Sequence, residues 1–172
     1  MVFDFIIETE RLILRCLDLC DAEHLYRLRS DPDYAELFGW TPYTSIKQAY
    51  ERIQRCRDDD SCYVFSVLPK TGKDAVGGVC IWNIENDKKI AEIGYDLEKE
   101  FRGKGYAFEA CVAVLHYAFD ELKMKTLTAF PQVTNQASIV LLKKLGFECK
   151  GVKKSFLDSG QEYEQYDYRL IC

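Results

Sequence analysis

The chain is organised around the hexapeptide Arg102-Gly103-Lys104-Gly105-Tyr106-Ala107. A strand-like run over residues 90–97 leads into it, and an apolar helical pattern follows it over residues 108–122. The first N–H groups of a helix have no intrahelical partner, and the helix dipole places partial positive charge there. Glycines let a ligand approach the backbone closely. This order of strand, glycine turn and helix predicts an anion site, with the phosphates of a nucleotide-like cofactor as its natural ligand.

Three phosphate-binding patterns compete for this segment. A P-loop requires G-x-x-x-x-G-K-[ST], which the chain does not contain. A dinucleotide fingerprint requires G-x-G-x-x-G, and Phe108 stands at the position of its third glycine. The pattern Arg/Gln-x-x-Gly-x-Gly/Ala is matched by Arg102, Gly105 and Ala107. For the hexapeptide alone, a plain tight turn between strand and helix is the alternative interpretation.

The flanking segments extend the match over nearly the whole chain. They are Thr9-Glu10-Arg11-Leu12-Ile13-Leu14-Arg15, Asn135-Gln136-Ala137-Ser138, Lys143-Lys144-Leu145-Gly146-Phe147 and Gly151-Val152. With the hexapeptide, they make the sequence resemble the GNAT N-acetyltransferases. Within that family it is similar to the RimJ/RimL type, which acetylates the N-termini of ribosomal proteins. The segments stand in the family's order and near its spacing.

The composition indicates one domain over residues 1–172. Apolar residues make up 48% of the chain, and a chain of 172 residues buries roughly two thirds of its unfolded surface. No apolar run approaches the ~18 residues of a membrane span, and residues 1–5 lack the basic region of a signal peptide. The net charge of −5 disfavours nonspecific nucleic-acid binding and suits a cationic amine substrate. We therefore expect neither a membrane nor a nucleic acid as a partner.

The cysteines and histidines indicate a reduced, metal-free protein of the cytoplasm. The chain has eight cysteines without a C-x-x-C pair, and several lie among apolar neighbours, as small core residues do. The two histidines, His24 and His116, are not at metal-ligand spacing, and we expect both to be structural. Reduced thiols are therefore favoured over a disulfide framework.

Apolar periodicity and turn residues predict the element order β-α-α-β-β-β-α-β-α-β-β. Helices are expected after the capping residues Asp18 and Ser45, after Gly105 and after Asn135, with a loop or short helix over residues 34–43. The order predicts an α/β (α+β) class with a mixed central sheet and helices packed on it. The expected strands cover residues 11–17, 62–68, 75–84, 90–97, 126–130, 147–156 and 162–170, with the last two joined by a turn at Asp158-Ser159-Gly160.

The resemblance implies a mostly antiparallel sheet of about seven strands flanked by about four helices. It also implies that the strands near 90–97 and 126–130 splay apart and admit the pantetheine arm of acetyl-CoA, which pairs with strand backbone. Main-chain groups of Tyr95, Asp96 and Leu97 would face this arm. In the family a backbone N–H on this strand polarises the thioester carbonyl. An ordinary buried strand is the alternative for these residues.

The resemblance also gives the remaining cofactor contacts. The backbone amides of Arg102, Gly103, Lys104, Gly105, Tyr106 and Ala107 would hold the pyrophosphate of coenzyme A, and the two cationic side chains could add charge. Asn135 would form a hydrogen bond to the cofactor arm, and the Ser138 hydroxyl would supply a proton to the departing thiolate. The alternatives are helix capping for Asn135, which can coexist with cofactor contact, and a small packing contact for Ser138.

The general base is expected to be Glu92. An amine must lose a proton before it attacks a thioester, and many GNAT enzymes use a carboxylate on this strand. A sheet residue paired with a cation is the alternative for Glu92. The sequence departs from the family at two positions: a tyrosine acid is replaced by Leu142, and a glutamate of RimL-type enzymes by Leu157. Glu162 and Glu164 lie near the second position, so the catalytic pair can differ, or transfer can rely on positioning and a water-borne base.

The acceptor pocket is expected in the segment between the first two helices. Its aromatic residues are Tyr34, Phe38, Trp40 and Tyr43, for which core packing and a homodimer contact form the alternative. The resulting hypothesis is an acetyl-CoA-dependent N-acetyltransferase that transfers acetyl directly to a primary amine, either a protein N-terminus or a small molecule. Polyamines, amino acids and aminoglycosides are other acceptors in the same chemistry. A coenzyme A-binding module with reduced catalysis is the alternative of a different class.

Overall fold

The computed structural model describes residues 5–59, 61–157 and 160–172. Its helices are α1 (Ala22–Ser30), α2 (Pro32–Phe38), α3 (Ile46–Asp58), α4 (Tyr106–His116) and α5 (Gln136–Lys144). Its strands are β1 (Ile7–Glu8), β2 (Leu12–Cys16), β3 (Tyr63–Pro69), β4 (Gly77–Glu85), β5 (Ile90–Leu97), β6 (Thr126–Ala129), β7 (Glu148–Phe156) and β8 (Glu162–Ile171). Residues 158 and 159 of the predicted last turn lie outside the described residues.

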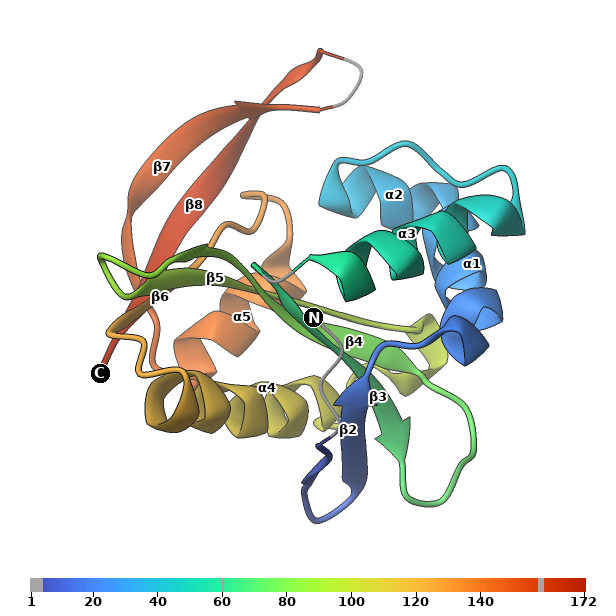
Figure 1. The fold of residues 1–172 in the computed structure, drawn as a ribbon. Helices are drawn as coiled ribbons and strands as arrows, with labels where there is room; N and C mark the ends of the chain where they lie inside the picture. The colour runs from blue at the N-terminus through green and yellow to red at the C-terminus, as the bar shows by residue number, and fades with distance from the viewer. Residues whose placement is uncertain (1–4, 60, 158–159) are drawn as a thin grey trace.

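The strands form one sheet in the order β1-β2-β3-β4-β5-β6-β8-β7. Every neighbouring pair is antiparallel except β5–β6, which is parallel. Helices α4 and α5 cover one face, and α1, α2 and α3 gather on the other (Figure 1). The predicted mixed, mostly antiparallel sheet is confirmed. It has eight strands rather than about seven because the two-residue β1 is too short to give a periodic signal.

Local signals explain where α2 and α3 begin and where α2 ends. Ser45 and Gln48 form a capping box at the start of α3. The Asp31 carboxylate accepts the N–H of Asp33 at 3.0 Å, so the residue that ends α1 also caps α2. Gly39 ends α2 in the left-handed conformation, with φ of 76°. The segment expected to be a loop or short helix therefore contains a helix, and the described residues form five α-helices rather than about four.

The predicted divergence of two strands is confirmed by their pairing. β5 and β6 pair only from Ile90 with Thr126 to Glu92 with Thr128. Beyond Glu92, β5 continues to pair with β4 as far as Leu97. One edge of β5 is therefore open over residues 93–97, and this opening is the organising feature of the site.

The larger core lies between the sheet and the helices α4 and α5. Its fully buried side chains include Leu12, Leu14, Phe65, Val67, Ile81, Ala91, Val114, Leu127 and Leu142. A smaller core holds α1 and α3 against the opposite face, with Ala49 and Ile53 at its centre. In the part of the chain that the structure describes, no helix is both long and apolar enough to cross a membrane.

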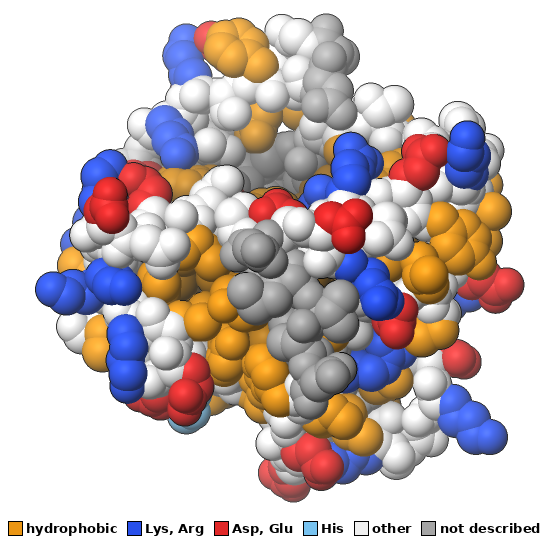
Figure 2. Space-filling view, viewed as in Figure 1, with side chains coloured by type: hydrophobic (Ala, Val, Ile, Leu, Met, Phe, Trp, Pro, Cys, Tyr) orange, Lys and Arg blue, Asp and Glu red, His pale blue; other side chains and the backbone are white. Residues whose placement is uncertain are grey.

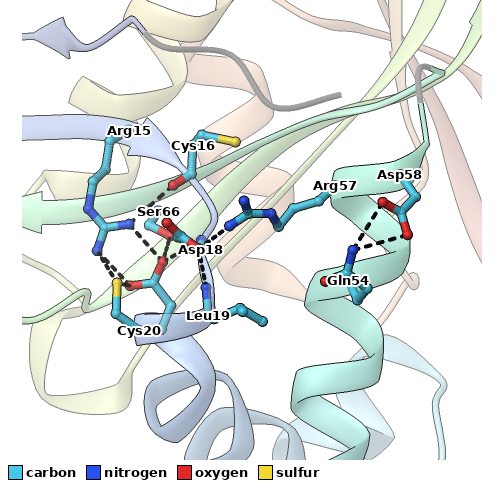
Figure 3. A network of polar contacts seen from close by, with 10 residues as sticks. Arg15, Cys16, Asp18, Leu19, Cys20, Gln54, Arg57, Asp58 and Ser66 are labelled. Atoms are coloured by element: carbon cyan, nitrogen blue, oxygen red, sulfur yellow. Dashed lines mark hydrogen bonds and ion pairs between the residues drawn. The ribbon is translucent and has the colours of Figure 1, made fainter.

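A buried ionic network ties the end of β2 to the beginning of α1 (Figure 3). The Asp21 carboxylate accepts from both terminal nitrogens of Arg15, at 2.8 and 2.7 Å, and from the Ser66 hydroxyl at 2.7 Å. Burial raises the pKa of Asp21, but the hydrogen bonds from Arg15, from the backbone near Asp18 and from Ser66 outweigh it and lower the pKa. Asp18 extends the network by an ion pair with Arg57.

Replacing Asp21 by Asn should lower the free energy of unfolding by about 3 kcal/mol, because Arg15 then loses its charged partner in a buried setting. Since the folded protein lowers the Asp21 pKa, this stabilisation exists above the ordinary carboxyl pKa near 3.9 and disappears as pH falls through the lowered value. Urea unfolding at pH 7 and at pH 3 measures both effects. The control Glu51→Gln breaks an exposed pair with Lys47 and should cost less than about 1 kcal/mol. Equal losses for both variants would contradict the account.

Candidate active site

The hexapeptide forms a turn that needs glycine at two positions. Gly103 and Gly105 have φ of 73° and 81°, in the left-handed region that side chains disfavour. Gly105 is the N-cap of α4 and supplies no side-chain cap. The first intrahelical bond of α4 runs from the Glu109 N–H to the Gly105 carbonyl at 3.1 Å. The N–H groups of the three residues before Glu109 therefore face outward from the helix end, as a phosphate site requires.

Residues near the N-terminus contact this turn and hold it in place. Arg11 donates to the Lys104 carbonyl at 2.9 Å and forms an ion pair with Glu109 at 2.7 Å. Its guanidinium lies 4.8 Å from the centre of the Tyr106 ring. Burial disfavours the charged form of Glu109, but hydrogen bonds from Thr9 and Arg11 outweigh it and lower the pKa. The sequence identified residues 9–11 only as a family marker, and the structure shows them in contact with the glycine turn and the first turn of α4.

The open edge of β5 presents main-chain groups of alternate residues. The Glu98 N–H donates to the Val76 carbonyl, on the side of β5 that faces β4. Because main-chain groups alternate between the two sides of a strand, those of Tyr95 and Leu97 point towards the opening. The Leu97 carbonyl there accepts from Arg102 Nε at 3.0 Å. Asp96 differs, since its main-chain groups point towards β4 by the same alternation.

The side chain of Asp96 lies on the helix α1 side of the sheet. Its carboxylate accepts the Gly78 N–H at 2.8 Å. Burial raises its pKa, and attraction to Arg29, His24 and Arg102 only partly opposes this. Asp96 therefore serves the packing of this face, whereas the arm of a cofactor would meet the backbone of its two neighbours in β5.

Asn135 and Ser138 lie together at the beginning of α5. The Asn135 side-chain oxygen accepts the Ser138 N–H at 3.1 Å and caps the helix. Its amide nitrogen is the group that remains to donate to a ligand. The Ser138 hydroxyl lies 2.7 Å from the Tyr95 hydroxyl, so the structure joins the first turn of α5 to β5.

Glu92 lies at the last paired position of β5 and β6. Its side chain points to the face opposite that of Ala91 and Ile93. The carboxylate accepts from the Asn83 amide at 3.0 Å. Burial raises its pKa, and the neighbouring donors Asn83 and Trp82 oppose this only in part. A partly buried carboxylate with a raised pKa has the properties of a candidate general base.

Three of the four aromatic residues in the segment over residues 34–43 pack together, and the fourth packs elsewhere. Phe38 and Trp40 are stacked with ring centres 4.7 Å apart, and Tyr34 lies 4.7 Å from Phe38. Arg29 covers the Trp40 ring at 3.4 Å. Tyr43 packs instead with the smaller core of α1 and α3. Of the four predicted acceptor residues, three are therefore brought together, and Tyr34 is almost fully buried among them.

The end of α2 lies close to the hairpin of β7 and β8, and a hollow separates the rest of the hairpin from the helices. The Gln132 side chain donates to the Glu36 carbonyl at 3.0 Å. A side-chain carbon at Gly39 would lie 2.9 Å from the Leu157 side chain. The space-filling view is hollowed between this hairpin and the helices, with hydrophobic side chains at the rim (Figure 2). Sequence reasoning missed the contribution of Gln132, which lies far from α2 along the chain.

Comparisons with known proteins agree with this geometry. A model of the acetyltransferase (GNAT) domain matches residues 11–148. The uncharacterized N-acetyltransferase p20 of Bacillus licheniformis is 36% identical over 95% of this chain and 89% of its own length. The [ribosomal protein uS5]-alanine N-acetyltransferase of Escherichia coli is 25% identical, covering 87% and 81% of the two chains. The solved structure of an acetyltransferase (GNAT family) from Bacillus anthracis has a TM-score of 0.86, at 24% identity and with 97% and 98% covered.

The chain belongs to the GNAT acetyltransferase family. It is an acetyl-CoA-dependent N-acetyltransferase that transfers acetyl to an amine. The site fits the cosubstrate: the glycine turn and the uncapped start of α4 suit a pyrophosphate, and the open edge of β5 suits an amide-containing arm.

Replacing Gly105 by Val should weaken acetyl-CoA binding at least about tenfold, because a β-branched residue disfavours φ of 81° and its side chain would crowd Arg11. Calorimetric titration measures the affinity. The control is Gly160→Val, which places the same residue at φ of 84°, where a side-chain carbon would have no atom of the other described residues within 4 Å apart from its chain neighbours. If both variants bind acetyl-CoA like the unaltered protein, the turn is not the phosphate site.

Proposed function

We propose that the enzyme acetylates the α-amine of a protein N-terminus by direct attack on the thioester, with Glu92 as general base and Ser138 as general acid. The observation that carries this proposal is the placement of the two groups about one strand. Glu92 lies on the α1–α3 face of β5, whereas Tyr95 directs its side chain to Ser138 on the α5 face. The open edge of β5 lies between them, so proton removal and proton donation would act from opposite sides of the reacting carbon.

Each group has a defined task in this proposal. Glu92 takes the proton of the incoming ammonium, directly or through water, which its raised pKa favours. An outward-facing N–H of β5, from Tyr95 or Leu97, stabilises the negative charge that develops on the thioester oxygen. Ser138 then donates to the sulfur as the carbon–sulfur bond breaks. The glycine turn and Asn135 hold the cosubstrate in position, which supplies the proximity part of catalysis.

The hollow between α2 and the β7–β8 hairpin is the proposed entrance for the acceptor. Phe38 and Trp40 lie on its α2 side, and Leu157 contacts the end of α2 from the hairpin. An extended N-terminus presents a single amine at the end of a narrow chain. Such a chain suits a hollow that is bordered by the contact of Leu157 with the end of α2. An α-amine with a pKa near 7.7–8.0 also loses its proton more readily than a lysine side chain. The relative that acts on ribosomal protein uS5 supports this class of acceptor.

A coenzyme A-binding module with reduced catalysis is the second candidate. Leu142, at the position of the family's tyrosine acid, is fully buried in the core, and Leu157 offers no carboxylate at the hairpin. This candidate predicts acetyl-CoA binding without turnover. We further propose that residues 1–172 act as one domain in the cytoplasm, without nucleic acid. The aromatic stack packs within its own chain, as the core-packing alternative predicts.

The acceptor class is tested by comparing thiol release from acetyl-CoA with different amines. Peptides carrying a free N-terminus should support turnover, and the same peptides with a blocked N-terminus should not. Spermidine, free amino acids and an aminoglycoside form the comparison set. Turnover confined to one of these small amines would reject the protein N-terminus, and binding without turnover on any amine would favour the second candidate.

Replacing Glu92 by Gln should lower kcat about 100-fold with little change in acetyl-CoA affinity, because the base is lost and the shape is kept. In the unaltered enzyme, the rate should fall as pH decreases through the raised pKa of Glu92, which lies above that of an ordinary glutamate. The variant should lack this acidic limb. Glu85→Gln, on the neighbouring strand and exposed, is the control. An unchanged rate in Glu92→Gln would remove Glu92 as the base.

A further inference from the structure

A pair of hydroxyl groups connects β5 to α5 beside the opening. The oxygen of Tyr95 lies 2.7 Å from the Ser138 hydroxyl oxygen and 3.4 Å from the Ser138 carbonyl oxygen. The Ser138 N–H is held by Asn135 at 3.1 Å, so both ends of this serine are fixed. The sequence expectation for Tyr95 concerned its backbone alone, and the side chain has no role in that account.

Either hydroxyl can donate in this contact, and the chemistry of the two groups favours Tyr95 as the donor. A phenol is a stronger acid than an alcohol, and the 2.7 Å contact is the stronger of the two that Tyr95 makes. When Tyr95 donates to the Ser138 oxygen, the Ser138 hydrogen is free to point elsewhere. The serine lies in the first turn of α5, next to the capping residue Asn135. Its hydrogen can then be directed towards the opening where the leaving sulfur would lie.

The environment keeps Tyr95 in its donating form. The ring is partly buried between β5 and α5, and burial raises the pKa of the phenol, which the hydrogen bond with Ser138 opposes only in part. The fully buried thiol of Cys111 also faces this tyrosine. The phenol therefore stays protonated over the whole pH range in which an amine acceptor reacts.

We propose that Tyr95 is a positioning residue that orients Ser138 and completes a two-proton chain to the leaving group. This inference rests on the proposed role of Ser138 as the acid. In the transfer, the carbon–nitrogen bond forms and the carbon–sulfur bond breaks, and the amine proton passes to Glu92. The sulfur takes the Ser138 hydrogen while the Ser138 oxygen takes the hydrogen of Tyr95. Solvent then returns a proton to the phenolate.

Proton transfer from Tyr95 would make it easier for Ser138 to act as an acid. An alkoxide left on Ser138 would be a far stronger base than the thiolate it serves, so donation by the serine alone is unfavourable. A hydrogen bond from Tyr95 becomes stronger as negative charge grows on the Ser138 oxygen, since charge-assisted bonds are about twice as strong as neutral ones. The pair therefore provides an acid at a site where Leu142 has replaced the family's tyrosine.

The test is a set of variants assayed with acetyl-CoA and a peptide with a free N-terminus. Tyr95→Phe should lower kcat about tenfold and leave the KM for acetyl-CoA unchanged. Ser138→Ala should lower kcat more, and adding Tyr95→Phe to it should cause no further loss because the two act as a unit. The rate is also measured in mixtures of H2O and D2O and plotted against the deuterium fraction. The plot should be curved for the unaltered enzyme, in which two protons move, and straight for Tyr95→Phe, in which one of these protons is lost.

Tyr117→Phe is the matched control. Tyr117 is a partly buried tyrosine beyond α4 that packs against Phe5 at 4.9 Å and Tyr63 at 5.6 Å, in the larger core. Its removal should change neither kcat nor the isotope curve. A normal kcat in Tyr95→Phe together with a slow Ser138→Ala would overturn this inference alone. A normal rate in Ser138→Ala would overturn both the acid assignment and the role of Tyr95, and additive losses would reduce Tyr95 to a packing residue.

Discussion

The site depends on an unfinished pairing in the middle of the sheet. Strand β5 has a parallel partner only as far as Glu92, and from residue 93 onwards one of its edges has none in β6. Backbone N–H and C=O groups require partners, and an open edge in a sheet is a template for another extended chain. In this protein Arg102 satisfies one such carbonyl, on Leu97. In the proposed function, the opening would provide both the binding energy and the direction of the cosubstrate arm.

Two groups of contacts flank this opening. The glycine turn places the uncapped start of α4 at its end, and the ion pair of Arg11 with Glu109 fixes that turn from a distant part of the chain. On the other side, α2 is joined to the loop between β6 and α5 through Gln132 and lies against Leu157, the residue after β7. In the proposed function, these contacts would limit how an acceptor can approach. In the proposed function, phosphate binding and acceptor binding would therefore lie on different elements, which would allow one to vary without the other.

Local sequence patterns predicted most of the fold and only part of the site. The strand over Ile90–Leu97 and the glycine turn carry strong periodic and turn signals, and the structure has both. The two-residue β1 has no period to detect, and Asp31 acts both as a helix stop and as a helix cap, which left α2 ambiguous. Contacts such as Tyr95 with Ser138 join residues far apart in the chain, so no local pattern can reveal them. They appear only when the sheet brings the two elements together.

Amide hydrogen exchange with and without acetyl-CoA tests the central claim most directly. Acetyl-CoA should slow exchange at the N–H groups of Tyr95 and Leu97 and at the start of α4, while the β4-facing amide of Glu98 changes little. That result would place the cosubstrate arm along the open edge of β5. Binding that protects other amides and leaves these unchanged, or an absence of binding by the folded protein, would contradict the account.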